Sequence, residues 1–276
     1  GSLAQMSGDS RAAGQHYAAR WSAASPTKRV ASGPVGIQSS NVLRASCAAV
    51  LLVASTGVAR AGTGESPGPL FHPDGPGEYR VRTAAGALVD ILPRQTVESE
   101  LRTVPQLTGA VRVGLPAGFS ADARASVIYV TNQLELGAAW SHRVGDLSFG
   151  VMDHFGVWYG ILDMQGFDAA AWGYLNQPGV NLGVPMGDIR FSLAVEGIIM
   201  LAQHVRLGDT THISRQNITL AGASLTLVVE NFVGKRGDVY YGVAAMYAQP
   251  DYQAWIAFSD SRSHLWYPRF LAGYAF

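Results

Sequence analysis

The sequence is poor in charge, in cysteine and in long apolar runs, and each shortage narrows what the chain can be. Charged residues make up only 14% of its 276 residues, whereas the surfaces of soluble proteins usually carry dense charge. The longest apolar run, Cys47–Ala59, is thirteen residues long. A helix that spans a bilayer needs about 20 residues, so this run is too short to be one. Beyond Gly62 no segment has a convincing helical period, which argues against a helical fold.

The spacings that would indicate metal or phosphate chemistry are also missing. No His-x3-His, Cys-x2-Cys or His-Glu-x-x-His pattern occurs, and no Gly-rich loop is followed by Lys and then Ser or Thr. We therefore expect no metal ion and no cofactor. After Gly62 the chain has 14 basic and 19 acidic residues, a net charge of 14 − 19 = −5. Nucleic-acid binding, which needs a basic stripe, is not expected.

The apolar run has the features of an export signal. Arg44 precedes it, its length suits a signal-peptide core, and Ala59-Arg60-Ala61 provides a small-x-small cleavage pattern. We predict cleavage after Ala61, with residues 1–61 as a long leader and 62–94 as a flexible Pro/Gly-rich segment. Cleavage would remove Cys47, the only cysteine, and a chain without thiols suits an oxidising periplasm.

What the chain does have, beyond Gly62, is alternation of apolar and small polar residues over long segments. A strand tilted across a bilayer needs about 9–11 residues, and several of these segments exceed that. The pattern predicts an all-β fold. The predicted strands include Gln133–Ser141, Asp146–Leu162, Ile189–Gln203, Ile213–Asn231, Val239–Ala248, Tyr252–Ser259 and Leu265–Phe276. In the second of them the phase breaks at Asp153-His154, which indicates a β-bulge.

The predicted barrel comprises residues 95–276, and its strand count depends on how its first segment is assigned. It is eight if Gln95–Leu115 is one long strand, which the length of the other strands favours. It is ten if that segment is a hairpin and Ala84–Leu92 is another strand. Both counts are even, as in single-chain membrane barrels.

The connections between these strands fall into a short and a long set. Val144–Asp146, Leu207–Asp209 and Gln249–Asp251 are short turns that we place on the same side as the C-terminus. The longer connections are placed on the other side: Pro116–Ala125, Met164–Gly187, Val233–Asp238 and Asp260–His264. The longest is predicted to be an external loop whose aromatic residues Phe167, Trp172 and Tyr174 either fold over the mouth of the barrel or bind a ligand.

The last strand carries the most specific signal. Phe270, Ala272, Tyr274 and Phe276 share one face, and Phe276 ends the chain. This pattern resembles the terminal strand of bacterial outer-membrane β-barrels. The resemblance implies an antiparallel transmembrane barrel in the outer membrane of a Gram-negative bacterium. It also implies that Phe270, Tyr274 and Phe276 form the signal read by the barrel-assembly machinery, with outer-membrane lipid around a monomer.

The faces opposite the Leu/Val/Phe stripes are mostly Gly, Ser, Ala and Thr, which fit a narrow lumen better than a solvated surface. They also carry five charged residues: Glu135, Arg190, Glu196, Glu230 and Arg269. Because unpaired buried charges are costly, we expect both arginines to pair inside with one of the glutamates. The lumen would then be filled by side chains, and the barrel would not be a general diffusion pore.

Three functional readings follow. The first is a non-enzymatic, porin-like barrel that is structural or passes a small solute, with external loops that contact ligands. The second is a lipid hydrolase or acyltransferase with Ser261, Ser263 and His264 as its only candidates. Adjacent residues on one loop rarely form a catalytic triad, so we favour the first reading. The third is a soluble periplasmic β-barrel.

Overall fold

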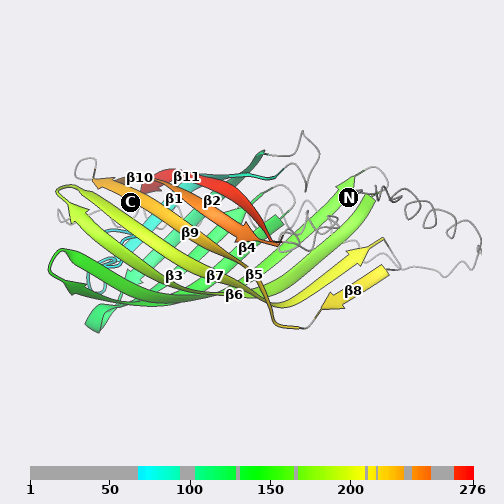
Figure 1. The fold of residues 1–276 in the computed structure, drawn as a ribbon, viewed down its shortest axis with the longest axis horizontal. Helices are drawn as coiled ribbons and strands as arrows, with labels where there is room; N and C mark the ends of the chain where they lie inside the picture. Colours follow the sequence, from blue (N-terminus) through cyan, green and yellow to red (C-terminus); the bar gives the residue numbers. More distant parts are fainter. Residues whose placement is uncertain are drawn as a thin grey trace, which may run out of the picture. The chain divides into compact units, whose positions relative to one another are not determined.

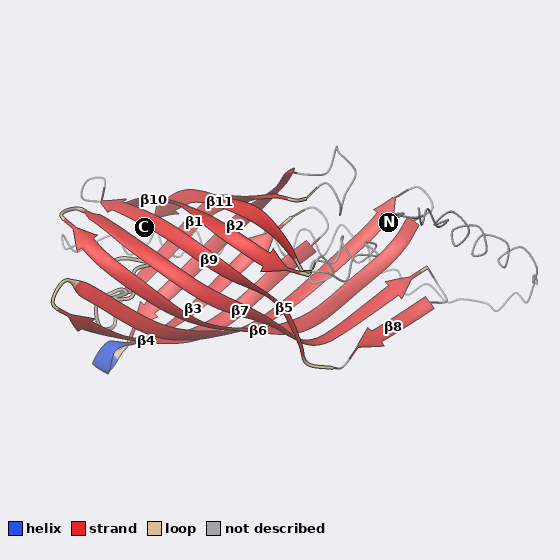
Figure 2. Ribbon diagram, viewed as in Figure 1, coloured by secondary structure: helices blue, strands red, loops and turns tan. Residues whose placement is uncertain are grey.

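The computed structural model describes residues 68–93, 103–128, 131–164, 167–208, 211–215, 217–232, 238–249 and 264–276. Within these ranges the chain forms eleven strands. They are β1 Val81–Ile91, β2 Thr103–Gly114, β3 Phe119–Val127, β4 Thr131–Val144, β5 Leu147–Met164, β6 Phe167–Met186, β7 Ile189–Leu207, β8 Thr211–Arg215, β9 Thr219–Phe232, β10 Asp238–Ala248 and β11 Leu265–Ala275. A single short helical turn, Pro116–Gly118, interrupts the strands in these ranges (Figure 2). No helix in them is long and apolar enough to cross a membrane.

The sheet closes on itself, so the described part of the chain is an antiparallel β-barrel (Figure 1). β1 pairs with β2 on one side and with β11 on the other, and the remaining neighbours are paired in chain order through β6–β7, β7–β9 and β9–β10. β8 pairs with Gln203–Leu207 of β7, beyond the stretch that β9 covers, so it adds no position to the ring. The barrel therefore has ten strands in these ranges. The prediction of a barrel is confirmed, the count of eight is wrong, and the alternative of ten is right.

The predicted boundary at residue 95 is also wrong. β1 lies inside the segment 62–94 that was expected to be flexible, and its pairing with β11 closes the barrel. β2 is a single strand rather than the hairpin that accompanied the ten-strand alternative. The predicted strand Tyr252–Ser259, the leader 1–61 and the cleavage site lie outside the described residues.

The predicted loop Met164–Gly187 is the largest error, because its residues form β6, a strand of 20 residues. Its glycine-rich composition is typical of loops, but here the glycines occupy inward positions beside large side chains. A Cβ atom at Gly173 would lie 2.8 Å from Nε1 of Trp158, and one at Gly183 would lie 2.3 Å from Nε2 of His72. Glycine is required at these positions because lumen side chains leave no room for more.

The two ends of the barrel have different connections. At the C-terminal end, where β11 stops, the strands are joined by residues 115–118, 145–146, 187–188 and 233–237. At the opposite end they are joined by residues 92–102, 128–130, 165–166, 208–218 and 249–264. The connections at the C-terminal end have two to five residues, whereas three of the five at the opposite end have eleven or more. Membrane barrels are expected to carry their longer connections at one end. The individual sides predicted for four connections are wrong, however: Pro116–Ala125, Leu207–Asp209, Val233–Asp238 and Gln249–Asp251. β10 pairs directly with β11, so counting Tyr252–Ser259 as a strand of the ring between them reversed the sides of the last three of these connections. β5, β6 and β7 are the longest strands and extend past the ends of β9–β11 at the opposite end (Figure 1).

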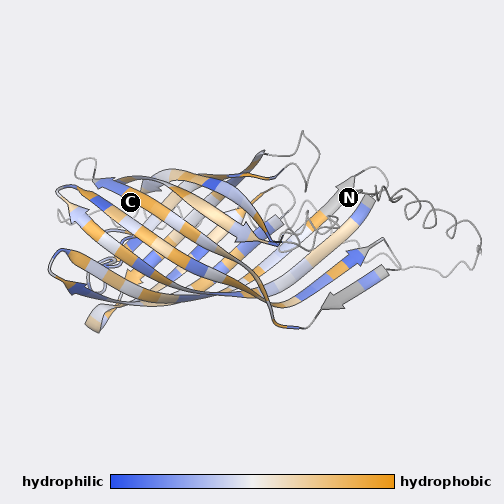
Figure 3. Cartoon of the chain, viewed as in Figure 1, coloured by the Kyte–Doolittle hydropathy of each residue, from blue (hydrophilic) through white to orange (hydrophobic). Residues whose placement is uncertain are grey.

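Polarity is inverted relative to a soluble protein. Large apolar side chains face outward and are exposed on most strands, among them Leu136, Phe155, Leu182, Val195, Leu227 and Phe270. Charged and polar side chains face inward and are buried, among them Arg82, Asp90, Arg112, His154 and Glu230. The alternation along each strand is visible in Figure 3. Asp153 is exposed and His154 is buried, and β5 stays in continuous register with both neighbours at this point. The predicted bulge is therefore wrong.

Outward aromatic residues gather near both ends of the strands. Near the C-terminal end, Trp140, His142 and Phe149 form mutual ring contacts. Near the opposite end, Trp172 contacts Tyr174 and His204, and Tyr247 contacts Trp266. Such pairs of aromatic girdles are typical of strands that cross a bilayer. Two other aromatic residues, Trp158 and Tyr267, are buried in the lumen.

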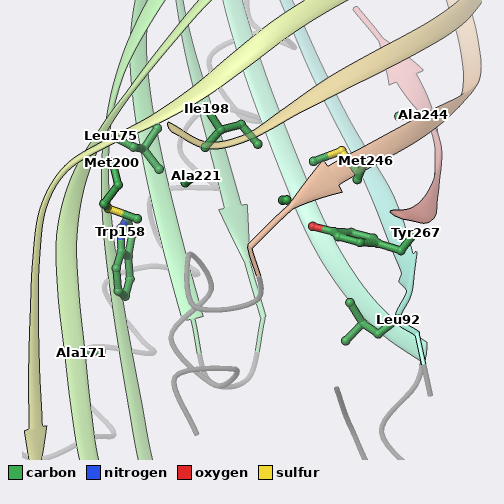
Figure 4. Packing of buried hydrophobic residues seen from close by; sticks show 11 residues of the cluster. Leu92, Trp158, Ala171, Leu175, Ile198, Met200, Ala221, Ala244, Met246 and Tyr267 are labelled. Atoms are coloured by element: carbon green, nitrogen blue, oxygen red, sulfur yellow. The ribbon is translucent and has the colours of Figure 1, made fainter. Parts of the chain in front are cut away.

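The lumen contains an apolar layer toward the opposite end (Figure 4). Its members come from β5, β6, β7, β9, β10, β11 and the residue after β1: Trp158, Ala171, Leu175, Ile198, Met200, Ala221, Ala244, Met246, Ala248, Tyr267 and Leu92. A second, smaller apolar cluster around Tyr240 and Leu70 lies toward the C-terminal end. Buried charged residues are not confined to the space between these layers, because Arg82 precedes Ala84 on β1 and Asp238 precedes Tyr240 on β10, which places both on the C-terminal side of the second cluster.

Because β1 and β11 close the ring, we predict that replacing one glycine at their contact strongly reduces refolding of the barrel. A Cβ atom at the inward position Gly86 would lie 2.2 Å from the hydroxyl of Tyr240 and 2.6 Å from the carbonyl oxygen of Ala272. Gly86→Val should therefore separate β1 from β11, at a cost of about 1–3 kcal/mol or more for overpacking. We expect a large loss of the fast-migrating band in unboiled gel samples after refolding. Ala87→Val is the control, because this neighbour is exposed and faces outward. Equal refolding of the two variants would contradict the closure contact.

Candidate functional site

A short segment of the chain lies inside the barrel at its C-terminal end. This plug segment, Leu70–Asp74, precedes β1 and has Leu70, His72 and Pro73 buried. Glu230 of β9 accepts three hydrogen bonds from its backbone: from Leu70 N–H at 2.7 Å, from His72 N–H at 2.9 Å and from Phe71 N–H at 3.1 Å. A buried carboxylate needs such donors, because an unpaired one is costly.

Arg112 of β2 holds the plug segment from the other side. Its guanidinium donates to the carbonyl oxygens of Leu70 at 2.9 Å, His72 at 3.0 Å and Pro73 at 3.4 Å, and its Nε donates to the Ser120 hydroxyl. The acidic side chain of the plug segment is also paired. Asp74 lies 3.6 Å from Arg143 and 3.9 Å from Arg190, and it accepts a hydrogen bond from Ser148. Strands β2, β4, β5, β7 and β9 thus all hold the plug segment.

His72 is neutral in this arrangement. The backbone N–H of Asp74 donates to its Nδ1 at 3.3 Å, which places the proton on Nε2. Burial away from water is the main cause that lowers the pKa of His72 to about 4, with the nearby arginines acting in the same direction and Asp74 opposing them.

A cavity of about 230 Å³ lies next to the plug segment inside the barrel. Near this cavity lies a group of ionisable residues from four strands, which we call the central cluster: Asp122, Arg124, Glu135, His154 and Glu196. Arg124 lies 3.3 Å from Asp122 and 3.2 Å from Glu196, and Glu135 is its direct cross-strand neighbour. His154 has Nε2 2.9 Å from Asp122 and Nδ1 3.8 Å from Glu196.

Gly137 makes the contact between His154 and Asp122 possible. It stands between them in the ladder, paired with Asp122 on β3 and with His154 on β5. A Cβ atom at this position would lie 2.1 Å from the His154 ring. A side chain there would therefore displace the imidazole from the carboxylate.

The five residues predicted to form the lumen network all lie on the inner side of the barrel, where Arg190 is the direct cross-strand neighbour of Glu230. Arg269 donates to both oxygens of Asp90, at 2.7 and 3.0 Å, and Arg190 lies near Asp74. Glu196 pairs with Arg124, Glu135 accepts from Gln133, and Glu230 binds the plug segment. Asp74, Asp90 and Arg124 were not predicted as partners because they belong to segments that were assigned to a flexible leader or a loop.

The predicted catalytic residues are not brought together in the described part of the chain. Ser261 and Ser263 lie outside it, while the His264 ring lies 3.1 Å from the Leu220 carbonyl oxygen and stacks on Tyr247. The aromatic residues of the predicted external loop belong to β6, where Trp172 and Tyr174 face outward and Phe167 is the first residue of the strand. The described residues contain no group of three or more His, Cys, Asp or Glu side chains that could hold a metal ion.

The residues of the predicted assembly signal share the outward face of β11. Phe270 is exposed, and the rings of Tyr274 and Phe276 lie 5.0 Å apart. The backbone of Phe276 also exchanges hydrogen bonds with Thr83 of β1, so the last residue takes part in closing the barrel.

A further set of lumen residues was not singled out from the sequence. Arg82 and Asp90 lie on β1, and the first forms an ion pair with Asp238 of β10. The signal was present, because Arg82, Ala84, Gly86, Leu88 and Asp90 follow a period of two with small and polar members. It was read as part of a Pro/Gly-rich leader.

No family model and no curated protein matches the sequence. Among solved structures, the chain is similar to the outer-membrane protease OmpT from Escherichia coli, with 8% identity, a TM-score of 0.41 and coverage of 71% of this chain and 95% of that one. It is also similar to a KdgM porin, with 9% identity, a TM-score of 0.35 and coverage of 71% and 98%. A third match is the translocator domain of the autotransporter NalP from Neisseria meningitidis, with 12% identity, a TM-score of 0.34 and coverage of 86% and 97%. The matched proteins are outer-membrane β-barrels, and the barrel class of this chain rests on its own strand pairing.

The burial of neutral His72 predicts a pH dependence of stability. Its pKa is about 4 in the folded chain and about 6.5 in an unfolded one, so between these values the unfolded state binds more protons. The contribution of this residue is complete above pH 6.5 and is lost as the pH falls toward 4, by at most about 3 kcal/mol. Urea unfolding in detergent should therefore show a lower midpoint at pH 4.5 than at pH 7.5. His72→Gln should reduce this difference, and an unchanged pH profile in that variant would contradict the assignment.

Proposed function

We propose that the chain is a non-enzymatic outer-membrane β-barrel of a Gram-negative bacterium, and that its lumen passes small polar solutes only when the plug segment withdraws. The observation that carries the proposal is the inverted polarity of the barrel, with an apolar outer surface and a charged interior that holds a segment of its own chain. The proposal keeps the predicted export signal, monomeric state and insertion by the barrel-assembly machinery.

The outer surface supports the membrane location. Soluble proteins rarely expose contiguous apolar patches of more than a few hundred Å². Here large apolar side chains are exposed on most strands of the ring, between two groups of aromatic residues. A soluble periplasmic barrel would place its apolar face inside, and this arrangement counts against that alternative.

The lumen supports restricted passage rather than free diffusion. Residues Leu70–Asp74 are fixed at one end by Glu230 and Arg112, and the apolar layer around Trp158 lies toward the other end. Between them is the cavity of about 230 Å³, which has room for a small solute. Breaking the bonds to Glu230 and Arg112 would free one end of the lumen without breaking a strand ladder.

The surroundings of His154 support a non-enzymatic role. Its Nε2 contacts the carboxylate of Asp122, and its Nδ1 is nearest to the carboxylate of Glu196. In the described ranges neither nitrogen is hydrogen-bonded to a hydroxyl, as a serine nucleophile would require. Phospholipid hydrolysis by the refolded chain that is abolished by His264→Ala would contradict this part of the proposal.

The membrane location is tested by fractionation and gel mobility. We expect the expressed chain in the outer-membrane fraction, with a mobility shift between boiled and unboiled samples, because closed membrane barrels resist SDS until heated. Recovery in the soluble fraction with equal mobility in both samples would favour the soluble barrel.

Restricted passage is tested by conductance in planar bilayers. The wild-type chain should give small or rare openings. Glu230→Gln and Arg112→Ala should each increase the open time, because each removes hydrogen bonds, worth about 0.5–3 kcal/mol apiece, that hold the plug segment. Arg206→Ala is the control, since its ion pair with Asp168 is partly exposed and distant from the plug segment in the pairing order. Large permanent openings in the wild type, or no change in the two plug variants, would contradict the proposal.

A further inference from the structure

The last residue of the plug segment, Asp74, is held through its side chain, whereas β2 and β9 hold the backbone of the residues before it. The Asp74 carboxylate accepts a hydrogen bond from the hydroxyl of Ser148. It also lies 3.6 Å from a guanidinium nitrogen of Arg143 and 3.9 Å from one of Arg190. Two guanidinium groups and one hydroxyl thus converge on one carboxylate, and we call these three partners the Asp74 site.

The Asp74 site lies at the C-terminal mouth of the barrel. Arg143 is the last residue but one of β4, Ser148 is the second residue of β5, and Arg190 is the second residue of β7. The Arg143 side chain is 50% exposed, that of Arg190 is 26% exposed and that of Asp74 is 21% exposed. Solvent and small solutes at this end of the barrel therefore reach the two guanidinium groups.

The two arginines hold Asp74 loosely. The lumen pair of Arg269 and Asp90, by comparison, is joined by two hydrogen bonds of 2.7 and 3.0 Å, and Asp90 is fully buried. At the Asp74 site the nitrogen–oxygen distances of 3.6 and 3.9 Å are beyond hydrogen-bonding range. Partly exposed ion pairs of this kind contribute little free energy, so an anion from solution can take the place of the Asp74 carboxylate.

Such a replacement needs no change in the charge around the arginines. Asp146 lies 3.9 Å from Arg143 but is 93% exposed on the turn between β4 and β5. Glu230 is the cross-strand neighbour of Arg190, and it accepts three hydrogen bonds from the plug segment. An anion that binds while Asp74 turns outward to water exchanges one carboxylate for another, and both of these acids keep their surroundings.

We propose that the Asp74 site binds the carboxylate or phosphate group of a small anionic solute, with which the Asp74 side chain competes. Guanidinium groups bind such oxyanions through paired N–H donors, and the Ser148 hydroxyl is a further donor. Binding of the solute would release the plug segment from β4, β5 and β7 and leave only β2 and β9 to hold it. The inference rests on the proposed function in one respect, because it names the class of solute that promotes opening.

The test is isothermal titration of the full chain, refolded in detergent, with succinate, phosphate and the neutral diamide succinamide. We expect saturable binding of at least one of the two anions and little binding of succinamide. Asp74→Asn should tighten anion binding roughly fivefold, because the apparent affinity rises with the fraction of molecules whose site is open. The double variant Asp74→Asn/Arg190→Gln should lose this gain. Asp188→Asn is the matched control, since it removes one carboxylate from the exposed turn between β6 and β7 at the same end.

Three results would overturn the proposal: anion binding that is absent or not tightened in Asp74→Asn, equal binding of succinamide, or equal tightening in Asp188→Asn. The mobility shift on unboiled gels shows whether each variant is folded, and the comparison of probes on the wild type needs no variant. Longer openings in Glu230→Gln and Arg112→Ala without anion binding would support restricted passage and exclude the anion site. Tightened anion binding in Asp74→Asn together with insulating bilayers would contradict restricted passage and support the anion site.

Discussion

The pairing of β1 with β11 is the contact on which the rest of the structure depends. It joins Ala84–Asp90 to Arg269–Ala275 and so removes the last two open edges of the sheet. An open edge in hydrocarbon would leave backbone N–H and C=O groups without partners, each at a cost of several kcal/mol. Closure also creates the interior. Arg82 reaches Asp238, and Arg269 reaches Asp90, only because the first and last strands of the barrel lie side by side.

Inward and outward positions of the barrel are under different constraints. Outward side chains are apolar and restrict one another little, whereas inward side chains include charged groups that lie close together. Glu230 and Arg112 reach the backbone of the plug segment from two strands, and Arg124 lies between Asp122 and Glu196. Glycines at positions such as 137, 173 and 183 give these large groups their space. The function that we propose depends on this inner surface, where fit is tight, rather than on the outer one.

The two-residue period and the terminal aromatic strand were sufficient to predict an antiparallel barrel with a polar lumen. The prediction failed where the amino-acid composition of a segment suggested a loop although its alternation indicated a strand. β6 reads as a loop because its glycines, Asn176 and Pro178 are turn formers, and β1 was hidden behind a Pro/Gly-rich stretch. The five lumen charges could be named from their face of the strand, but their partners could not. Which carboxylate meets Arg269 depends on β1 lying next to β11, and no local pattern contains that information.

The plug segment links parts of the chain that are far apart in sequence. Leu70 is bound by Glu230, 160 residues away, and by Arg112, 42 residues away. These bonds join β9 to β2 across the inside of the barrel without any strand pairing. Residues Leu70–His72 therefore connect two strands of the ring that no ladder joins, and the wall of the barrel is braced from within by a stretch of backbone that belongs to no strand.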